Sequence, residues 1–500
     1  MFHEAVALHA RRVLPDSVPL ELTKARRSLT RANTSRTGQE ALDVAIEAAG
    51  ADHLHITCLY GHDQTRTRVA KALRELLGLP LDRESFAANG IESSFGSVTI
   101  VFLSPLGAAE RLSGKTERGD LESWICQAID PPSSASRGRM ISAAIVETGD
   151  PNELRGSDKD PKHIIRRTLA ARRIVTQFLS STGHEGTIGT DDEESDHPAE
   201  RGLWDLLRSA GVFPRTFPSA SGIAEDTWLV GVHVVQRRSD KKSGYRRKRG
   251  EGFVVSIIGI KAGSHKAIGY DPGRGWQRLD QFTAAFLASP QDHDEGGAKS
   301  LIETAVNQLL IRQPQAKVVV FLGAQGCRRF WSGLQDTGGN ELPRFATRDR
   351  VAVVRVRPDP NEVPRVAGMG GWPRDGDSEP QRPHTTNALY RIKEEHWPGA
   401  MYYVSTSSTM DRRGSHRDCT RFSCPPAALR DNWHAHTMTE FWSPFPGPFG
   451  EDSLYELASL LCRQAPTWDG TLDRPSPIHL AEAVVLDHPD RYEVRNEEAE

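Results

Sequence analysis

The sequence has few cysteines and no long apolar run. Its six cysteines are scattered over 500 residues, so they do not form the dense disulfide framework of a small secreted protein. No run approaches the roughly 20 apolar residues of a membrane-spanning helix. Residues 1–22 contain no apolar core of signal-peptide length. We therefore expect a cytoplasmic protein with no membrane segment.

Nucleotide-binding motifs, internal repeats and a large excess of charge are also missing. The chain has no P-loop of the Walker type and no GxGxxG between a predicted strand and a predicted helix. It has no repeat of about 20–50 residues. The net charge is only −3, so a nucleic acid would have to bind at local basic clusters. Such clusters occur at Arg166-Arg167, at Arg172-Arg173 and in residues 237–249.

A regular alternation of strands and helices begins near residue 53. Continuous apolar runs predict buried strands at His55–Leu59, Val98–Leu103 and Met140–Val146. Apolar residues at helical spacing predict helices at Thr65–Leu79, Glu122–Ala128 and Glu200–Ala210. Because strands alternate with helices, we expect a mainly parallel sheet that is covered on both faces.

A second α/β region starts near residue 225 and opens with antiparallel strands. Trp228–Gln236 and Phe253–Ile260 are predicted to pair around a basic turn, and Gly269–Gln277 is predicted to be a turn-rich loop. Further elements are predicted at Lys299–Ile311, Lys317–Leu322, Val351–Val356, Met401–Ser405, Thr437–Trp442, Ser453–Arg463 and Pro477–Leu486. Antiparallel strands followed by alternating helix and strand fit a ribonuclease H-like layout.

The stretch 160–180 combines helix signals with closely spaced cations. It begins with an N-capping residue followed by proline. Lys162 and Arg166 are four residues apart and therefore lie on one helix face, and cations beside the free N–H groups of a helix start suit a bound phosphate. Thr176 is expected to cap a second element and to bring Gln177 near the same place. The alternative is an amphipathic helix with a solvated basic face.

Cysteines and histidines near residue 420 include the ligand types that bind zinc. Cys419 and Cys424 lie among three histidines between residues 416 and 436. Their spacing is irregular, so packed or exposed thiols are the favoured interpretation, and we predict no metal site here.

Five further segments carry a signal through their order along the chain. They are DPKHIIRRTLAARRIVTQF (160–178), ERGLWDLLRSAGV (200–212), VVVFLGAQGCRRFWSGL (318–334), TMTEFWSPF (437–445) and RPSPIHLAEAVVLDH (474–488). In this order they resemble the MID–PIWI half of the Argonaute/PIWI superfamily, and most closely the prokaryotic PIWI-RE family. The resemblance implies an α/β fold. After an N-terminal helical and polar segment (1–50), a Rossmann-like MID domain (51–222) would be followed by an RNase H-like PIWI domain (223–500).

The resemblance implies that the MID domain holds the 5′ end of a guide strand. By position, Lys162 and Arg166 match the family's two first-helix residues at the terminal phosphate, and Gln177 matches the glutamine that follows. Arg208, on the next helix, is a further candidate. Two cations and an amide beside a helix start suit a phosphate, because they offer charge-assisted hydrogen bonds.

The family is named after two residues, an arginine after a core strand and a glutamate late in the PIWI domain. In this sequence Arg328 and Glu440 match these positions. A salt bridge and a contact with the backbone of a bound duplex are both open. The alternative is a surface arginine and an edge-strand glutamate. Cations of the basic hairpin are the candidate contacts with the duplex backbone: Arg237, Arg246, Arg247 and Lys248.

Cleavage by an RNase H-like domain needs several carboxylates that hold two Mg²⁺ ions. At the matching positions the sequence has His233 in the first strand, Gly323 at the end of a later strand and His479 in the last helix. A histidine and a glycine cannot bridge two hard cations as aspartates do. We therefore expect a degenerate centre, and a protein that binds without cutting. The alternative is an active metal-dependent nuclease that uses other acids.

The resemblance also implies partners and a role. A guide strand and its target are the expected ligands. A DinG-type helicase and a restriction-endonuclease-like protein are the expected partners, in defence against plasmids or phages. No cofactor is assigned to the protein itself, and Mg²⁺ can accompany bound nucleic acid. Whether the guide is RNA or DNA, and whether it starts with a phosphate or a hydroxyl, stays open.

Overall fold

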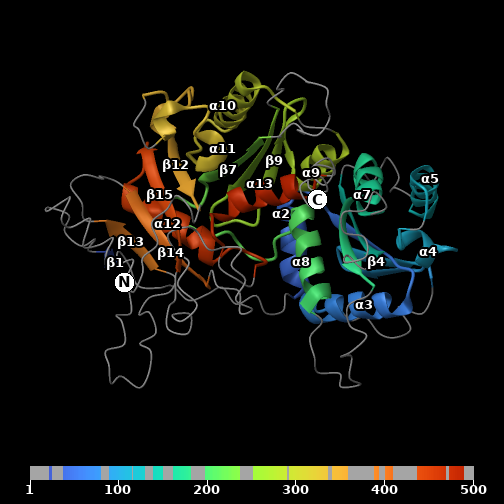
Figure 1. The fold of residues 1–500 in the computed structure, drawn as a ribbon. Coiled ribbons are helices and arrows are strands. Elements are labelled where there is room, and N and C mark those ends of the chain that lie inside the picture. Colours follow the sequence, from blue (N-terminus) through green and yellow to red (C-terminus); the bar gives the residue numbers. More distant parts are fainter. Residues whose placement is uncertain are drawn as a thin grey trace, which may run out of the picture.

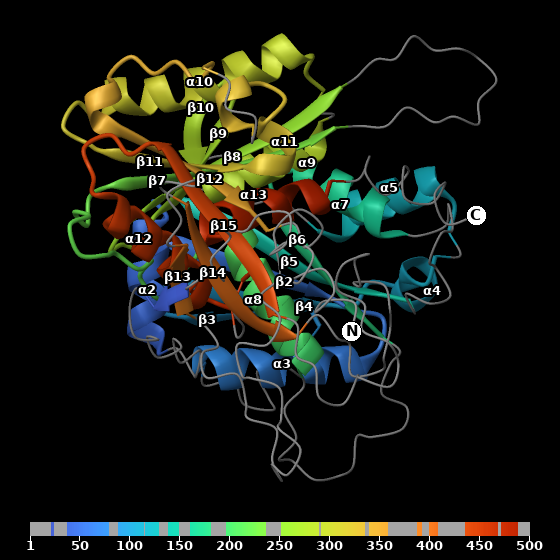
Figure 2. The same ribbon diagram turned by 60° about the vertical axis from the view of Figure 1, so that its left-hand side comes forward.

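Two α/β domains, each built on one sheet, lie side by side (Figures 1 and 2). The structure, a computed structural model, describes residues 22–24, 38–79, 89–114, 116–129, 139–149, 161–181, 197–236, 252–289, 292–335, 340–358, 388–392, 400–408, 436–468 and 472–488. None of the helices in these ranges is long and apolar enough to cross a membrane.

The first domain contains a five-stranded sheet in the order β3-β4-β2-β5-β6. Its strands are β2 (His53–Leu59), β3 (Glu92–Phe95), β4 (Val98–Leu103), β5 (Met140–Thr148) and β6 (Val175–Ser180). Strands β4, β2, β5 and β6 are parallel, and β3 pairs antiparallel with β4 at one edge. The predicted mainly parallel sheet is confirmed, because the continuous apolar runs became strands buried on both faces.

Helices cover both faces of this sheet. One face packs against α2 (Gln39–Ala48), α3 (Asp63–Leu77) and α8 (His197–Ala210). The other packs against α4 (Ala108–Leu112), α5 (Arg118–Ala128) and α7 (Pro161–Ala171). Helix α2 precedes the expected start of the domain at residue 51, yet its Leu42, Ala45 and Ile46 are buried in the core of this domain.

The second domain contains a ten-stranded sheet in the order β1-β13-β14-β15-β12-β11-β7-β8-β9-β10. Its strands are β1 (Leu22–Lys24), β7 (Trp228–Gln236), β8 (Phe253–Lys261), β9 (Ala267–Asp271), β10 (Gly275–Arg278), β11 (Val318–Gly323), β12 (Val351–Arg357), β13 (Ala388–Ile392), β14 (Ala400–Ser408) and β15 (His436–Phe445). Strands β7 to β10 form an antiparallel meander. Strands β11 and β12 run parallel to β7. This arrangement confirms the expected ribonuclease H-like layout.

Helices also cover both faces of the larger sheet. One face carries α9 (Leu279–Ala288), α12 (Glu451–Arg463) and α13 (Ser476–Leu486). The other carries α10 (Glu295–Arg312) and α11 (Ala324–Cys327), with short 3₁₀ turns at Ser332–Leu334 and Arg348–Arg350. Helix α13 crosses β7 closely, because a Cβ on Gly231 would lie 2.1 Å from the carbonyl carbon of Pro477.

Two local predictions are wrong. The residues 269–277 are not a loop, because β9 and β10 form a tight hairpin that turns at residues 272–274 and buries Trp276; Gly275, with φ of 78°, begins β10 opposite Asp271. Thr176 does not cap a helix, because it lies within strand β6. Helix α7 ends before it in a reversal at Arg173, whose φ of 64° breaks the helix, and the β-branched residues that follow favour a strand.

Candidate nucleic-acid interface

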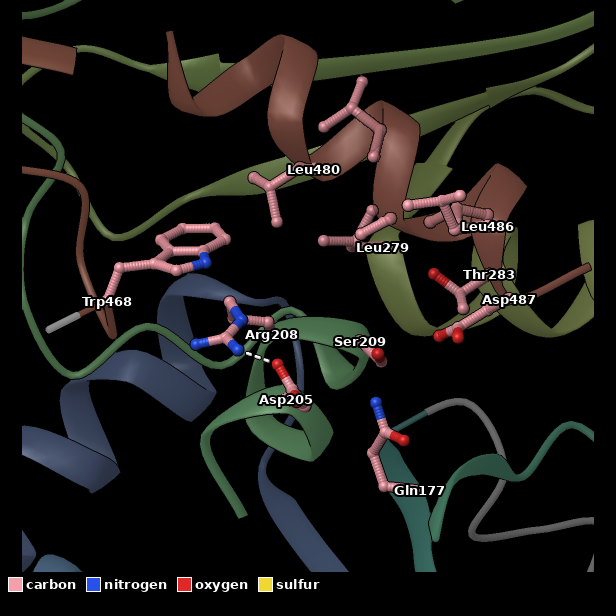
Figure 3. A pocket seen from close by; sticks show the side chains of 13 residues that line it. Gln177, Asp205, Arg208, Ser209, Leu279, Thr283, Trp468, Leu480, Leu486 and Asp487 are labelled. Atoms are coloured by element: carbon pink, nitrogen blue, oxygen red, sulfur yellow. Dashed lines mark ion pairs between the residues drawn. The ribbon is translucent and has the colours of Figure 1, made fainter. Parts of the chain in front are cut away.

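A cavity of about 170 Å³ lies where the two domains meet (Figure 3). It is lined by Gln177, Asp205, Arg208, Ser209, Ile258, Leu279, Thr283, Trp468, Leu480, Ala483, Val484, Leu486 and Asp487. The first domain contributes only polar side chains, from β6 and α8, whereas most of those from the second domain are apolar. A polar wall therefore faces an apolar one, which is the usual character of a small-molecule or nucleotide site.

Arg208 projects from the last turn of α8 into this cavity (Figure 3). Its guanidinium forms an ion pair with Asp205, one turn earlier on the same helix, and donates to the backbone carbonyl of Thr467. The guanidinium carbon also lies 4.5 Å from the ring centre of Trp468. These contacts hold the side chain of Arg208 in one place, and Trp468 adds an aromatic surface beside it.

Arg166 does not line the cavity and is only 4% exposed. Its Nη1 is 3.2 Å from Oδ1 of Asp487, at the end of α13, and donates to the backbone carbonyl of Asp487 at 3.2 Å. The guanidinium carbon lies 5.0 Å from the ring centre of Phe178. Burial raises the pKa of the Asp487 carboxyl, and Arg166 opposes that rise. The predicted basic helix face is therefore partly buried in an ion pair between the domains.

The structure brings three of the four predicted 5′-end residues to one place. Gln177 and Arg208 line the cavity directly, and Arg166 meets it through Asp487. In Figure 3 the amide group of Gln177 points towards the cavity from β6. Lys162, in the first turn of α7, is not one of the residues that line the cavity.

The usual ligand crevice of an open parallel sheet is filled by the protein itself. Such crevices lie at the carboxyl ends of the central strands, where the strand order reverses. Here Glu147, near the end of β5, accepts hydrogen bonds from the backbone N–H groups of Gly61 at 2.9 Å and His62 at 3.0 Å. Its other oxygen lies 2.5 Å from Nδ1 of His62. Because a buried carboxylate occupies these donors, an anionic ligand is not expected there.

His233 and Gly323 share a second, smaller cavity at the predicted RNase H-like centre. Arg474, just before α13, also lines it. The guanidinium of Arg474 forms ion pairs with Asp473 at 2.9 Å and with Glu482 at 2.9 Å. Among the residues that the structure describes, no group of three or more histidine, cysteine or acidic side chains is placed to hold a metal ion.

His479 lies on the same helix α13 but is not one of the residues that line this second cavity. Its ring packs edge-on against Trp468, with ring centres 5.2 Å apart. Burial lowers the pKa of His479 to about 4, although the nearby Asp473 carboxylate acts in the opposite direction. His479 is therefore expected to be neutral near pH 7.

Glu440 and Arg328 lie on different elements of the second domain. Glu440, on β15, pairs with Arg355 on β12, and both side chains are nearly fully buried. Arg328 lies at the end of α11, where its backbone carbonyl accepts from Nε2 of Gln335 at 3.0 Å. The glutamate therefore has a structural partner that the sequence did not indicate.

Several predicted sites fall outside the described residues. They include the hairpin cations Arg237, Arg246, Arg247 and Lys248, the N-capping residue 160 and the cysteines and histidines 416–434. The strands on either side of the basic turn do pair as predicted, from Trp228 opposite Lys261 to Gln236 opposite Phe253.

Sequence reasoning missed the residues that complete these sites. Asp205 could have been found, because it lies three residues before Arg208 on one helix face. Trp468 and Asp487 have no local signal of this kind, because Arg208 and Arg166, which they contact, are distant in the sequence. Arg474 was missed although one of its partners, Asp473, is adjacent to it. Arg355 was also missed, since an arginine within a continuous apolar strand does not reveal its partner.

Comparison with protein-family models gives two matches. The model described as the RNaseH domain of pPIWI_RE matches residues 229–490, which is more than half of the chain. The model described as the MID domain of pPIWI_RE matches residues 106–218. No curated protein sequence matches the chain.

Comparison with solved structures finds Argonaute and Piwi proteins. Clostridium butyricum Argonaute, bound to a guide DNA and a target DNA, is 10% identical with a TM-score of 0.50, and the match covers 95% of this chain and 54% of that one. Drosophila Piwi is 10% identical with a TM-score of 0.46, and the match covers 92% of this chain and 50% of that one. The chain thus spans about half the length of these proteins.

Proposed function

The chain belongs to the pPIWI_RE family, and from this premise we propose that it binds a guide strand by its 5′ end and holds the duplex of guide and target without cutting it. The observation that carries the proposal is the cavity between the MID and RNase H-like domains, where Gln177, Arg208 and the Arg166–Asp487 pair converge. The similar Argonaute structure, which holds a guide DNA and a target DNA, supports the same assignment.

The side chains around the cavity suit the first nucleotide of a strand. The amide of Gln177 can both donate and accept hydrogen bonds. The indole of Trp468 offers a surface on which a base can stack. The apolar wall formed by Leu279, Leu480 and Leu486 (Figure 3) excludes water and so strengthens polar contacts on the opposite wall.

The position of the duplex and the biological role are proposed from the membership of this family. The guide–target duplex would lie along the RNase H-like domain, with its backbone held by Arg237, Arg246, Arg247 and Lys248, while base pairing supplies sequence specificity. We propose a place in cytoplasmic defence against plasmids or phages, with a helicase and a nuclease as partners. Arg328 remains a proposed contact with this duplex.

Replacement of Arg208 by alanine is expected to weaken binding of a single-stranded guide oligonucleotide. Arg208→Ala removes the one cation among the described lining residues and the guanidinium that packs on Trp468, so we expect the dissociation constant to rise about 10- to 100-fold. Gln177→Ala should also raise the dissociation constant, but by a smaller factor, because an amide carries no charge. Filter binding with a labelled oligonucleotide measures both.

Arg201→Ala provides the matched control, because Arg201 is an exposed arginine on the same helix α8. It lowers the net charge by the same amount and should leave the dissociation constant within about twofold, apart from a small screening effect. Equal losses for Arg208→Ala and Arg201→Ala would contradict the proposed pocket and indicate general charge attraction.

Cleavage of the target is expected to be absent with either Mg²⁺ or Mn²⁺. The second cavity contains His233, Gly323 and the cation Arg474 where a two-metal centre would need carboxylates. A guide, a complementary labelled target and each metal ion, incubated with the protein, should give no product above a no-protein control. Guide-directed cleavage that is abolished by Asp473→Asn would establish the rival function, an active metal-dependent nuclease.

A further inference from the structure

We infer that the cavity between the domains accepts an uncharged 5′-hydroxyl end in preference to a 5′-phosphate. This inference rests on the proposed function, since it concerns the same cavity. The inference is based on the charges of the site, where Arg166 and Arg208 each already pair with a carboxylate.

Arg208 is the one cation among the described residues that line the cavity, and Asp205 neutralises it. The Asp205 carboxylate is itself part of the lining, so a ligand that approaches Arg208 also approaches this negative charge. The guanidinium of Arg208 also contacts the Thr467 carbonyl and the Trp468 ring. Its donors are therefore largely used before a ligand enters.

Arg166 is neutralised in the same way from the other domain. Its partner Asp487 lines the cavity, whereas Arg166 is not among the lining residues and is nearly fully buried. A ligand at this end thus meets the carboxylate first. Two carboxylates and one guanidinium line the cavity, so the lining itself has a small excess of negative charge.

The chain segments that follow β6 and α13 contain more acidic than basic residues. Residues 182–196, which follow β6, contain six acidic residues and no lysine or arginine. Residues 489–500, which follow α13, contain five acidic residues and two arginines. Both segments are therefore acidic overall, as the lining is.

This distribution of charge favours a hydroxyl on chemical grounds. A terminal phosphate carries roughly −1.5 to −2 charges at pH 7, and repulsion by the two carboxylates is strong in a cavity with one apolar wall. A 5′-hydroxyl can instead donate to Asp205 or Asp487 and accept from the amide of Gln177 or the hydroxyl of Ser209. It needs no ion pair to be broken, whereas a phosphate must displace a carboxylate from an arginine.

The test compares one oligonucleotide with a 5′-hydroxyl and with a 5′-phosphate, as RNA and as DNA, in EDTA and in Mg²⁺. We expect the 5′-hydroxyl form to bind about tenfold more tightly or better in all conditions. Asp205→Asn and Asp487→Asn should each shift the preference towards the 5′-phosphate by about tenfold, because each removes one repelling charge. Asp349→Asn, at an exposed position in a 3₁₀ turn of the second domain, should leave the preference unchanged.

Asp487→Asn removes the carboxylate partner of a buried arginine, so its thermal unfolding is recorded beside binding. Asp205 is more exposed, and Asp205→Asn tests the same inference in a variant that keeps the buried pair. A wild-type protein that binds both ends equally, or that prefers the 5′-phosphate in EDTA, overturns the inference. A preference for the 5′-phosphate that appears only with Mg²⁺ also overturns it, and indicates a metal ion bridging the phosphate to a carboxylate.

Failure of this inference is distinguishable from failure of the proposed function. If the 5′-phosphate binds better and Arg208→Ala still weakens binding more than Arg201→Ala, the guide pocket stands and only its end preference is reversed. If neither end group nor Arg208→Ala changes the affinity, the cavity does not hold a guide end, and both proposals fall.

Discussion

Replacing Glu440 by alanine is expected to lower the free energy of unfolding by about 3–5 kcal/mol, the range for breaking a buried ion pair from one side. Glu440 and Arg355 are both 4% exposed and join the neighbouring strands β15 and β12. Arg355 also donates to the carbonyl of Leu334 at 2.9 Å, and its guanidinium carbon lies 4.8 Å from the ring centre of Trp442. Without Glu440, this guanidinium stays buried in a cluster that no longer holds its counter-charge.

Chemical denaturation of the variant and the wild type measures this loss. Glu122→Ala is the matched control, because Glu122 pairs with Arg118 at 3.1 Å on the surface of α5, where an ion pair contributes about 0–1 kcal/mol. The double variant Arg355→Met with Glu440→Leu should recover much of the stability, since it removes both charges and keeps apolar volume. A loss for Glu440→Ala no larger than that for Glu122→Ala would show that the pair is not needed for folding.

The second large effect is expected at the junction of the domains. Arg278, at the end of β10, forms a two-point ion pair with Asp280, with contacts of 2.7 and 3.0 Å. The same guanidinium donates to backbone carbonyls of the first domain, at Met140 (2.9 Å) and Gly50 (3.3 Å). One side chain therefore joins a buried acid of the second domain to two carbonyl groups of the first.

Arg278→Ala should lower the free energy of unfolding by about 3–5 kcal/mol, because it leaves Asp280 buried without its cation and the carbonyls without a donor. Burial already raises the pKa of Asp280, and Arg278 opposes that rise. We also expect guide binding to weaken about tenfold, although Arg278 does not line the cavity. The cavity is formed by residues of both domains, so it depends on their relative position. Denaturation followed by two probes, one for each domain, measures the coupling.

Arg274→Ala provides the control for this variant. Arg274 lies in the exposed turn between β9 and β10, and its replacement should change stability by less than about 0.5 kcal/mol. Arg278→Lys should rescue only part of the loss, because an ammonium cannot reproduce the two-point contact of a guanidinium. If Arg278→Ala unfolds in the same single transition as the wild type and binds guide with equal affinity, Arg278 is not a link between the domains.

Local patterns were enough to predict the elements of this chain and their order. The continuous apolar runs of β2, β4, β5, β7 and β11 predicted strands buried on both faces, and the helical spacing of α3, α10 and α12 marked one buried face. Failures occurred where local signals conflict. The glycines of 269–277 indicated a loop, yet the chain returns within them as a hairpin.

The candidate site could be predicted only in part. Arg166 was found from its spacing to Lys162, whereas Gln177 and Arg208 were assigned to the site through the resemblance to the family. Gln177 and Arg208 do line one cavity. The stretch around Lys162, however, was expected to present its cations together, and Arg166 instead turns inward to the end of α13.

The sequence by itself determined the alternation of strand and helix and the buried faces, because these depend on residues within one or two turns of each other. It also determined the family, through five segments that occur in a fixed order along the chain. Only the tertiary structure decided which charges meet. Arg166 and Asp487 are separated by 321 residues, and Arg355 and Glu440 by 85. A periodic pattern extends along a single helix or strand, whereas charged residues distant in the sequence meet only when the chain folds. That pairing decides whether an arginine at the cavity is neutralised by a carboxylate.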